Sequence, residues 1–165
     1  MSHSNIIKIK TLLHENDSFT FEPINVNVYE ENGFLDGYHD YVDTVSEEEE
    51  LDAYAWLEEN SVFVNDGIVD GIYRGLVHKS DVENWIADYK ARIEQALVNA
   101  FIDKNDISTY KLESVINPSN RIYVEDSCGQ YCSLPQFILS LYNIMTYHKV
   151  DTLYCVYEGV LDYHC

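Results

Sequence analysis

The longest amphipathic segment of the sequence is SDVENWIADYKARIEQALVNAF, residues 80–101, and the other elements are assigned around it. Its first four residues have the spacing of a capping box, in which Ser80 caps a helix and Glu83 bonds back to the cap. Apolar side chains then recur every three or four residues and form one stripe about six turns long. The members of this stripe are Val82, Trp85, Ile86, Tyr89, Ile93, Ala96, Leu97, Ala100 and Phe101. The pattern predicts a long helix near 80–103 that acts as core scaffold.

Strands are predicted on both sides of this helix, from alternating polarity or β-branched composition. They cover residues 6–13, 19–28, 62–64, 68–77, 107–116, 121–125 and 153–161. Pro23 interrupts the second strand, which is therefore expected to be bulged or at a sheet edge. The tripeptide Asn65-Asp66-Gly67 predicts a hairpin turn between the third and the fourth.

Two more helices are predicted from capping boxes. Ser46 and Glu49 have the capping spacing at the start of a helix that runs to about Asn60. Ser133 and Gln136 have the same spacing, and the intervening Pro135 is tolerated in a first helical turn. The elements follow one another without regular βαβ alternation. We therefore expect an α+β fold with a mixed or antiparallel sheet and about three helices.

The 165 residues fit a single domain, 1–165, but their charge is unevenly distributed. Residues 11–73 contain 17 acidic residues and no lysine or arginine, so with Lys8 and Lys10 the first 73 residues carry −15 of the net −19. Residues 74–165 hold 12 acidic against 8 basic residues. The chain thus has an N-terminal acidic part, 11–73, and a less charged part, 74–165.

This charge disfavours binding to nucleic acid or to an anionic membrane and favours a basic protein partner. No apolar run approaches the roughly 20 residues of a membrane-spanning helix. The N-terminus has no pattern of a secretory signal, and the four cysteines are too few for a secreted disulfide scaffold. We therefore expect a cytoplasmic protein with reduced thiols.

Aromatic residues interleave with the acids of 11–73, as a disordered tail would not show. An ordinary solvated face or an adaptation to salt would also explain acidic residues, but salt adaptation should reach the nearly balanced second half as well. Tyrosine beside carboxylate suits protein recognition. The candidate partner-binding residues are Asp36, Tyr38, Asp40, Tyr41, Asp43, Glu47, Glu48, Glu49, Glu50, Asp52, Tyr54, Glu58 and Glu59.

The leading hypothesis is a non-enzymatic inhibitor that mimics nucleic acid and occupies a basic nucleic-acid-binding groove of a partner, because such grooves concentrate positive charge. Anti-CRISPR and anti-restriction proteins of phages act in this way as a class. An immunity protein or antitoxin that caps a basic nuclease toxin would use the same physics. The Tyr-rich C-terminal strand around Tyr154 and Tyr157 suggests a possible homodimer through strand pairing.

A third hypothesis is a small zinc or thiol protein. Cys128, Cys132, His148 and Cys155 are of the ligand types that zinc prefers, although the usual second closely spaced pair is missing. Cys132 precedes a predicted helix N-terminus, which would lower a thiol pKa, and His148 would be its base. Phosphate-loop, dinucleotide, zinc-protease and hydrolase motifs are absent, and Asp66 to Asp70 lacks the spacing of a calcium loop. We expect no cofactor and no catalytic residue.

Overall fold

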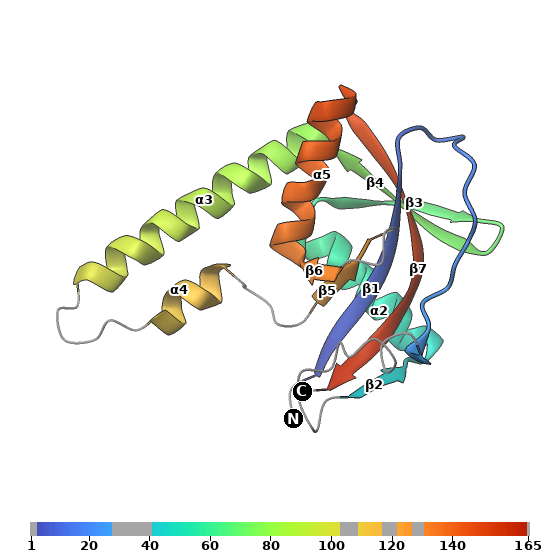
Figure 1. Cartoon of the computed structure of the whole chain (residues 1–165), viewed down its shortest axis with the longest axis horizontal. Coiled ribbons are helices and arrows are strands. Elements are labelled where there is room, and N and C mark those ends of the chain that lie inside the picture. The colour runs from blue at the N-terminus through green and yellow to red at the C-terminus, as the bar shows by residue number, and fades with distance from the viewer. Residues whose placement is uncertain (1–2, 28–40, 103–108, 117–121, 127–130, 165) are drawn as a thin grey trace.

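A seven-stranded mixed sheet forms the centre of the protein, in the computed structural model that describes residues 3–27, 41–102, 109–116, 122–126 and 131–164 (Figure 1). The order of strands is β3-β4-β7-β1-β5-β6, with β2 also paired to β7. The pair β1/β5 is parallel and the other pairs are antiparallel. The strands are β1 (His3–Leu12), β2 (Tyr41–Thr44), β3 (Phe63–Val69), β4 (Ile72–His78), β5 (Ile122–Glu125), β6 (Tyr131–Ser133) and β7 (Thr152–His164).

The helices complete an α+β fold, which confirms the expected class. They are α2 (Glu47–Asn60), α3 (Lys79–Ile102), α4 (Thr109–Ile116) and α5 (Leu134–His148). As predicted, α3 is the longest of these helices. Among the described helices, none combines the length with the apolar content that a bilayer crossing requires.

Two of the helix starts follow from the sequence as expected. Ser46 caps α2, because its Oγ accepts from the Glu49 backbone N–H and the Glu49 carboxylate accepts from the Ser46 backbone N–H at 2.8 Å. At α5, Gln136 Oε1 accepts from the Ser133 backbone N–H at 3.2 Å, with proline in the first turn. The helix α3 begins at Lys79, one residue before the predicted cap, so Ser80 lies inside it.

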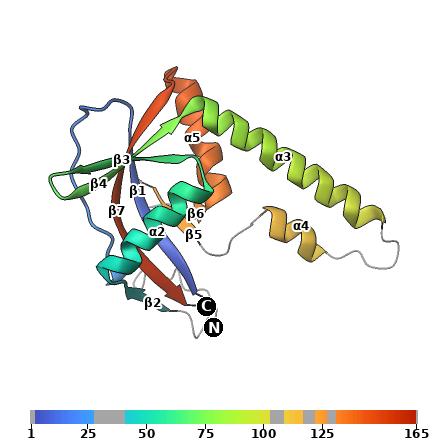
Figure 2. The same cartoon turned by 180° about the vertical axis from the view of Figure 1, so that it is seen from behind.

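The main core lies where α2, α5 and the beginning of α3 meet β1 and β7. Leu57 of α2, Ile138 of α5 and Val82 of α3 share one buried cluster with Ile9 and Tyr157. In both views these helices surround the central strands (Figures 1 and 2). A second, smaller cluster contains Ile6, Val42 and Leu161. The sheet therefore buries apolar side chains on both faces.

Only part of α3 is core scaffold. Val82 and Tyr89 are buried, whereas Leu97 is 38% and Val98 53% exposed. The far half of the helix projects away from the sheet and is accompanied by α4 (Figures 1 and 2), where the Tyr89 hydroxyl donates to the Ile116 carbonyl at 2.7 Å. The prediction of a continuous core helix was correct in length and wrong in burial, because the second half of the stripe faces α4 and solvent rather than the sheet.

The predicted strand over residues 19–28 is not formed in its described part. Residues 17–25 form neither helix nor strand. Residues 19–25 of this segment run beside β7 and are here called the strap. The Ile24 backbone N–H donates to the Glu158 carbonyl at 2.8 Å, between the part of β7 that pairs with β4 and the part that pairs with β2. Pro23 has no N–H to donate, which prevents a continuous ladder.

Two other predictions are corrected. The hairpin of β3 and β4 turns at Asp70-Gly71, both with positive φ, while Asn65-Asp66-Gly67 forms an irregularity inside β3. The Asn65 side chain accepts from the Gly67 backbone N–H, so this turn-like sequence makes a bulge instead. Residues 109–116, predicted as part of a strand, form α4, which is stabilised by packing against α3.

The sheet order contradicts the suggested strand pairing around Tyr154 and Tyr157, and a homodimer by another route stays a prediction. β7 is a central strand, with β1 on one side and β4, the strap and β2 along the other. Tyr157 is only 3% exposed. Among the described residues, Tyr154 is paired on both sides, with β1 and β4, and Tyr157 is paired with β1, so this part of β7 does not offer an edge to a second copy.

Candidate functional site

The exposed side of α2 is the strongest candidate site. Five of its carboxylates are exposed, and we call this set the α2 acidic face. Its members are Glu47, Glu48, Glu49, Asp52 and Glu59. Within the described chain, none of them forms an ion pair with a lysine or arginine. At about 1.5 Å rise per residue, four of these charges, from Glu47 to Asp52, lie within about 7.5 Å of the helix axis, and Glu59 lies about 10 Å further along.

The opposite side of α2 points into the core and engages three predicted binding residues, of which Tyr54 is buried and Glu50 and Glu58 are half-buried. Tyr54 is 4% exposed and donates from its hydroxyl to Glu50 Oε1 at 2.6 Å. Burial, together with this hydrogen bond, raises the pKa of Tyr54 far above its ordinary value. Glu58 Oε1 accepts from the Tyr157 hydroxyl at 3.5 Å. The inner side of α2 therefore uses these three residues for contacts within the protein: Tyr54 with Glu50 in the helix, and Glu58 with Tyr157 of β7.

Glu49 has a double role. Its Oε2 accepts from both the backbone N–H and the hydroxyl of Ser46, each at 2.8 Å, and the backbone bond is the larger cause of a lowered pKa for this carboxyl. The side chain nevertheless stays exposed. The carboxylates of Glu47, Glu48 and Glu49 sit at the positive end of the helix macrodipole, which reduces the cost of gathering them there.

The strand β2 supplies the neighbouring candidates. Asp43 is exposed, and Tyr41 is 39% exposed with its ring stacked on the His164 ring at 4.1 Å. The candidates Asp36, Tyr38 and Asp40 lie outside the described residues. Of the predicted partner-binding residues, the α2 acidic face, Tyr41 and Asp43 are thus exposed, Glu50 and Glu58 are half-buried in contacts with tyrosines, and Tyr54 is buried.

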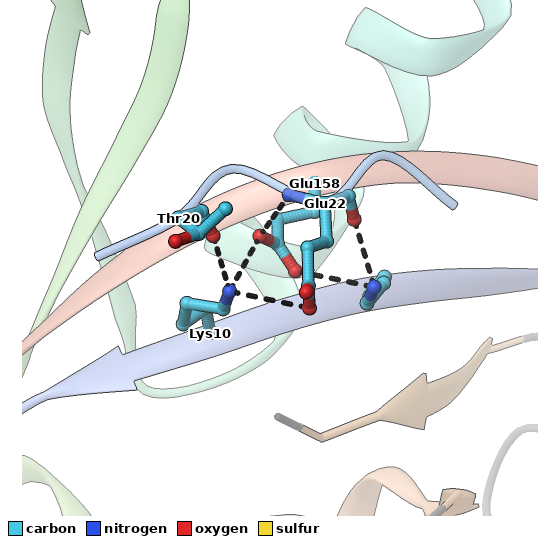
Figure 3. A network of polar contacts seen from close by, with 5 residues as sticks. Lys10, Thr20, Glu22 and Glu158 are labelled. Carbon is cyan, nitrogen blue, oxygen red and sulfur yellow. Dashed lines mark hydrogen bonds and ion pairs between the residues drawn. The ribbon is translucent and has the colours of Figure 1, made fainter. Parts of the chain in front are cut away.

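Two lysines, Lys8 and Lys10, directly precede the acidic part of the sequence. Their ammonium groups contact the strap and the buried carboxylate of Glu158 (Figure 3). Glu158, 1% exposed, lies 3.5 Å from the Lys8 Nζ and 3.1 Å from the Lys10 Nζ. Lys8 also donates to the Glu22 carbonyl at 2.7 Å, and Lys10 donates to the Thr20 carbonyl. Glu158 in turn accepts from the Glu22 backbone N–H at 2.8 Å.

Arg74, the next base in the sequence, is also directed at the strap, with its guanidinium 5.7 Å from the Phe19 ring centroid. The three bases Lys8, Lys10 and Arg74 therefore stabilise the strap and leave the α2 acidic face uncompensated. No local pattern in the sequence predicts this network, because Glu158 lies some 150 residues from the two lysines that contact it.

The cysteine residues of the zinc and thiol hypothesis are not gathered into one site. Cys132 lies in β6, just before α5, whereas His148 is the last residue of α5, a helix about 22 Å long, and Cys155 is buried in β7. Cys128 lies outside the described residues. Among those described, no group of three or more His, Cys, Asp or Glu is arranged to hold a metal ion.

The thiol of Cys132 also lacks the expected activation. Burial, and secondarily Asp126, raises its pKa to about 11, so the thiol is protonated at neutral pH. The nucleophilic pair of Cys132 with His148 is therefore contradicted both by the separation of the two residues and by the direction of this shift.

Comparison with known proteins gave no match to any protein-family model, curated protein or solved structure.

Proposed function

We propose that this protein is a non-enzymatic inhibitor that acts in the cytoplasm and binds the basic, nucleic-acid-binding surface of a partner protein. The observation that carries the proposal is the α2 acidic face: five exposed carboxylates on one capped helix, without a cation from the described chain. Acidic residues held on a folded surface attract a basic partner and increase its association rate.

The density of charge supports mimicry of a nucleic acid strand. The four carboxylates from Glu47 to Asp52 fall within about 7.5 Å of axis, a length over which each strand of duplex DNA carries about two phosphates. A groove that neutralises phosphates with lysine and arginine would therefore meet at the start of α2 a local charge at least as dense as that of a DNA strand. The helix is also rigidly placed, since Tyr54 and Leu57 anchor its inner side in the core.

The experiment compares two variants of equal net charge. The face variant carries E47Q, E48Q, D52N and E59Q, and it keeps Glu49, Glu50 and Glu58 because these make the capping and core contacts described above. The control variant carries E15Q, E83Q, E94Q and D151N, all exposed positions away from α2. Each protein is immobilised and exposed to extracts of cells that express candidate nucleases of defence systems, and bound proteins are eluted with duplex DNA.

The proposal expects the native chain and the control variant to retain a nuclease that duplex DNA elutes, and the face variant to lose it. Equal retention by the two variants would mean that total charge, and not the α2 acidic face, causes the binding. Retention of proteins without any affinity for nucleic acid would refute the mimicry. Thermal unfolding of both variants verifies that the substitutions leave the fold intact.

A further inference from the structure

An open groove of about 600 Å³ lies between the first half of α3, the end of α2 and the start of β3. The side chains that matter for its chemistry are Glu58, Val64, Asp81, Asn84, Trp85 and Asp88. The prediction that α3 is core scaffold did not include this groove. In the sequence, Asp81 and Asp88 look like ordinary polar residues on the solvent side of an amphipathic helix.

The groove is anionic and its charge is not neutralised. Three carboxylates line it and no lysine or arginine does. Asp81 and Asp88 are exposed, and within the part of the chain that the structure describes neither forms an ion pair. Glu58 is engaged with Tyr157 and Asn65, so Asp81 and Asp88 hold the acceptor capacity that remains.

The groove also offers an aromatic surface between these carboxylates. Asp81, Trp85 and Asp88 recur at helical spacing, so the indole lies on the same side of α3 as both carboxylates, which are about 10 Å apart along the axis. That separation is too large for both to bind one metal ion but suits a long cationic side chain. Val64, 43% exposed, adds an apolar contact.

The rings of α3 already accept a guanidinium from the chain itself. The Trp85 and Tyr89 rings are stacked at 4.9 Å, and the Arg92 guanidinium lies 6.0 Å and 5.8 Å from their respective centroids. Arg92 does not line the groove, so it leaves the groove carboxylates without a cation. These contacts show that the rings of α3 take part in cation–π interactions, and the indole, which also lines the groove, has Asp81 and Asp88 about one turn before and after it along the helix.

We propose that this groove, the α3 groove, binds an arginine side chain of the partner protein. The inference rests on the proposed function and names a specific anchor for the same partner, since Glu58 and the exposed Glu59 are consecutive in α2. A guanidinium stacks on an indole and donates from several N–H groups in one plane, whereas a lysine ammonium is a compact, strongly hydrated charge. The groove therefore selects arginine over lysine.

The test uses the full chain and three small probes, the N-acetyl amides of arginine, lysine and citrulline. Binding is followed by NMR at the indole N–H resonance of Trp85, assigned with a Trp56→Phe variant. Arginine amide is expected to shift this resonance saturably at low salt, lysine amide to bind several-fold more weakly, and uncharged citrulline amide to cause no saturable shift. Equal binding of arginine and citrulline, or of arginine and lysine, would overturn the proposal.

The variant D88N is expected to weaken arginine amide binding by about two- to fivefold, the effect of losing one exposed ion pair, and D81N/D88N is expected to weaken it further. D88N alone serves as the second variant, because Asp81 also lies in the first turn of α3 and its loss affects the helix start. The matched control E83Q/E94Q removes two exposed carboxylates of α3 outside the groove and is expected to bind as the native chain does. Unchanged binding by D88N and D81N/D88N would refute the anchor.

Failure of the anchor can be told apart from failure of the proposed function. The face variant is expected to bind arginine amide normally, since it retains Glu58, Asp81 and Asp88. If arginine amide fails to bind while nuclease capture still depends on the α2 acidic face, only the anchor is refuted. If arginine amide binds but no nuclease is captured, the proposed function fails and the groove stands as an arginine site.

Discussion

The Lys10 Nζ lies 3.1 Å from Oε1 of Glu158, a carboxylate whose side chain is fully buried. This pair links β1 and β7 and, through Glu22 and Thr20, fixes the strap across the sheet (Figure 3). Lys8 and Lys10 are thus both engaged by Glu158 and by carbonyl groups of the strap, and neither forms an ion pair with the α2 acidic face among the described residues.

Replacement of Glu158 by glutamine is expected to destabilise the fold by about 2 kcal/mol. The change preserves the shape of the side chain and removes the buried carboxylate that Lys8 and Lys10 share. The cost is below that of a fully buried pair because each lysine side chain is 13% exposed. Urea unfolding measures the loss, and hydrogen exchange at the Ile24 amide reports loosening of the strap.

The control for this substitution is E22Q. The Glu22 carboxylate lies 3.6 Å from Lys10 but its side chain is 61% exposed, so its removal should cost less than about 0.5 kcal/mol. A Glu158→Gln protein as stable as the native chain, with unchanged exchange at Ile24, would contradict the role given to this carboxylate.

The substitution Ser46→Ala should destabilise the protein by about 1 kcal/mol, because it removes the side-chain cap of α2. Ser80→Ala is the matched control, since Ser80 lies inside α3 and alanine is the better helix former. Chemical unfolding of both variants is the measurement. A loss at Ser80 equal to that at Ser46 would show that the capping geometry at the two helices has been assigned incorrectly.

The cap of α2 should also respond to acid. The pKa of Glu49 is lowered from its ordinary 4.5 by the hydrogen bonds from Ser46, so its contribution to stability is present above that pH and is lost as the pH falls through the lowered value. The difference in unfolding free energy between the native chain and E49Q should therefore shrink below pH 4.5. A difference that stays constant down to pH 2 would contradict this role for the carboxylate.

Two buried tyrosines should resist ionisation at alkaline pH. Burial raises the pKa of Tyr54 and of Tyr157 well above the ordinary 10.0. Their neutral forms contribute stability that is fully present below pH 10 and is lost as the pH rises beyond it, since the unfolded chain ionises first. Absorbance at 295 nm should show these two phenols ionising only when circular dichroism reports unfolding. Ionisation of all 14 tyrosines near pH 10 in a folded chain would contradict their burial.

The thiols of Cys132 and Cys155 should react slowly with Ellman's reagent at pH 8. Burial raises their pKa to about 11 and about 12, respectively, so little thiolate is present. The measurement uses a C128S/C165S background, which leaves only these two cysteines. Both should react quickly after unfolding in urea, and rapid reaction of either in the folded chain would restore the thiol hypothesis.

The sequence predicted the elements that depend on local chemistry. The capping residues Ser46 and Ser133 and the apolar period of α3 act within one or two turns of helix, so their outcome did not depend on the rest of the chain. The strap and α4 were missed for the opposite reason. Their conformations depend on distant partners, Glu158 for the strap and Tyr89 for α4, that no local pattern reveals.

The candidate site was predicted by region more accurately than by residue. Charge counting indicated residues 11–73, and α2 within them does carry an exposed acidic face. Counting charges could not separate Glu48, which faces solvent, from Glu50, two residues later in the same run of glutamates. The Glu50 carboxylate accepts a hydrogen bond from the buried Tyr54. That distinction depends on which side of α2 packs on the sheet.

The α2 acidic face is proposed to take the place of nucleic acid on a basic partner. The decisive measurement is the affinity of this protein for a captured nuclease over a range of salt concentrations, with and without duplex DNA as competitor. We expect the logarithm of the affinity to fall linearly with the logarithm of the salt concentration, and this slope to become shallower in the E47Q/E48Q/D52N/E59Q variant. We also expect DNA and this protein to exclude each other from the nuclease. Salt-independent binding, or simultaneous binding of DNA and this protein to the nuclease, would contradict the proposal.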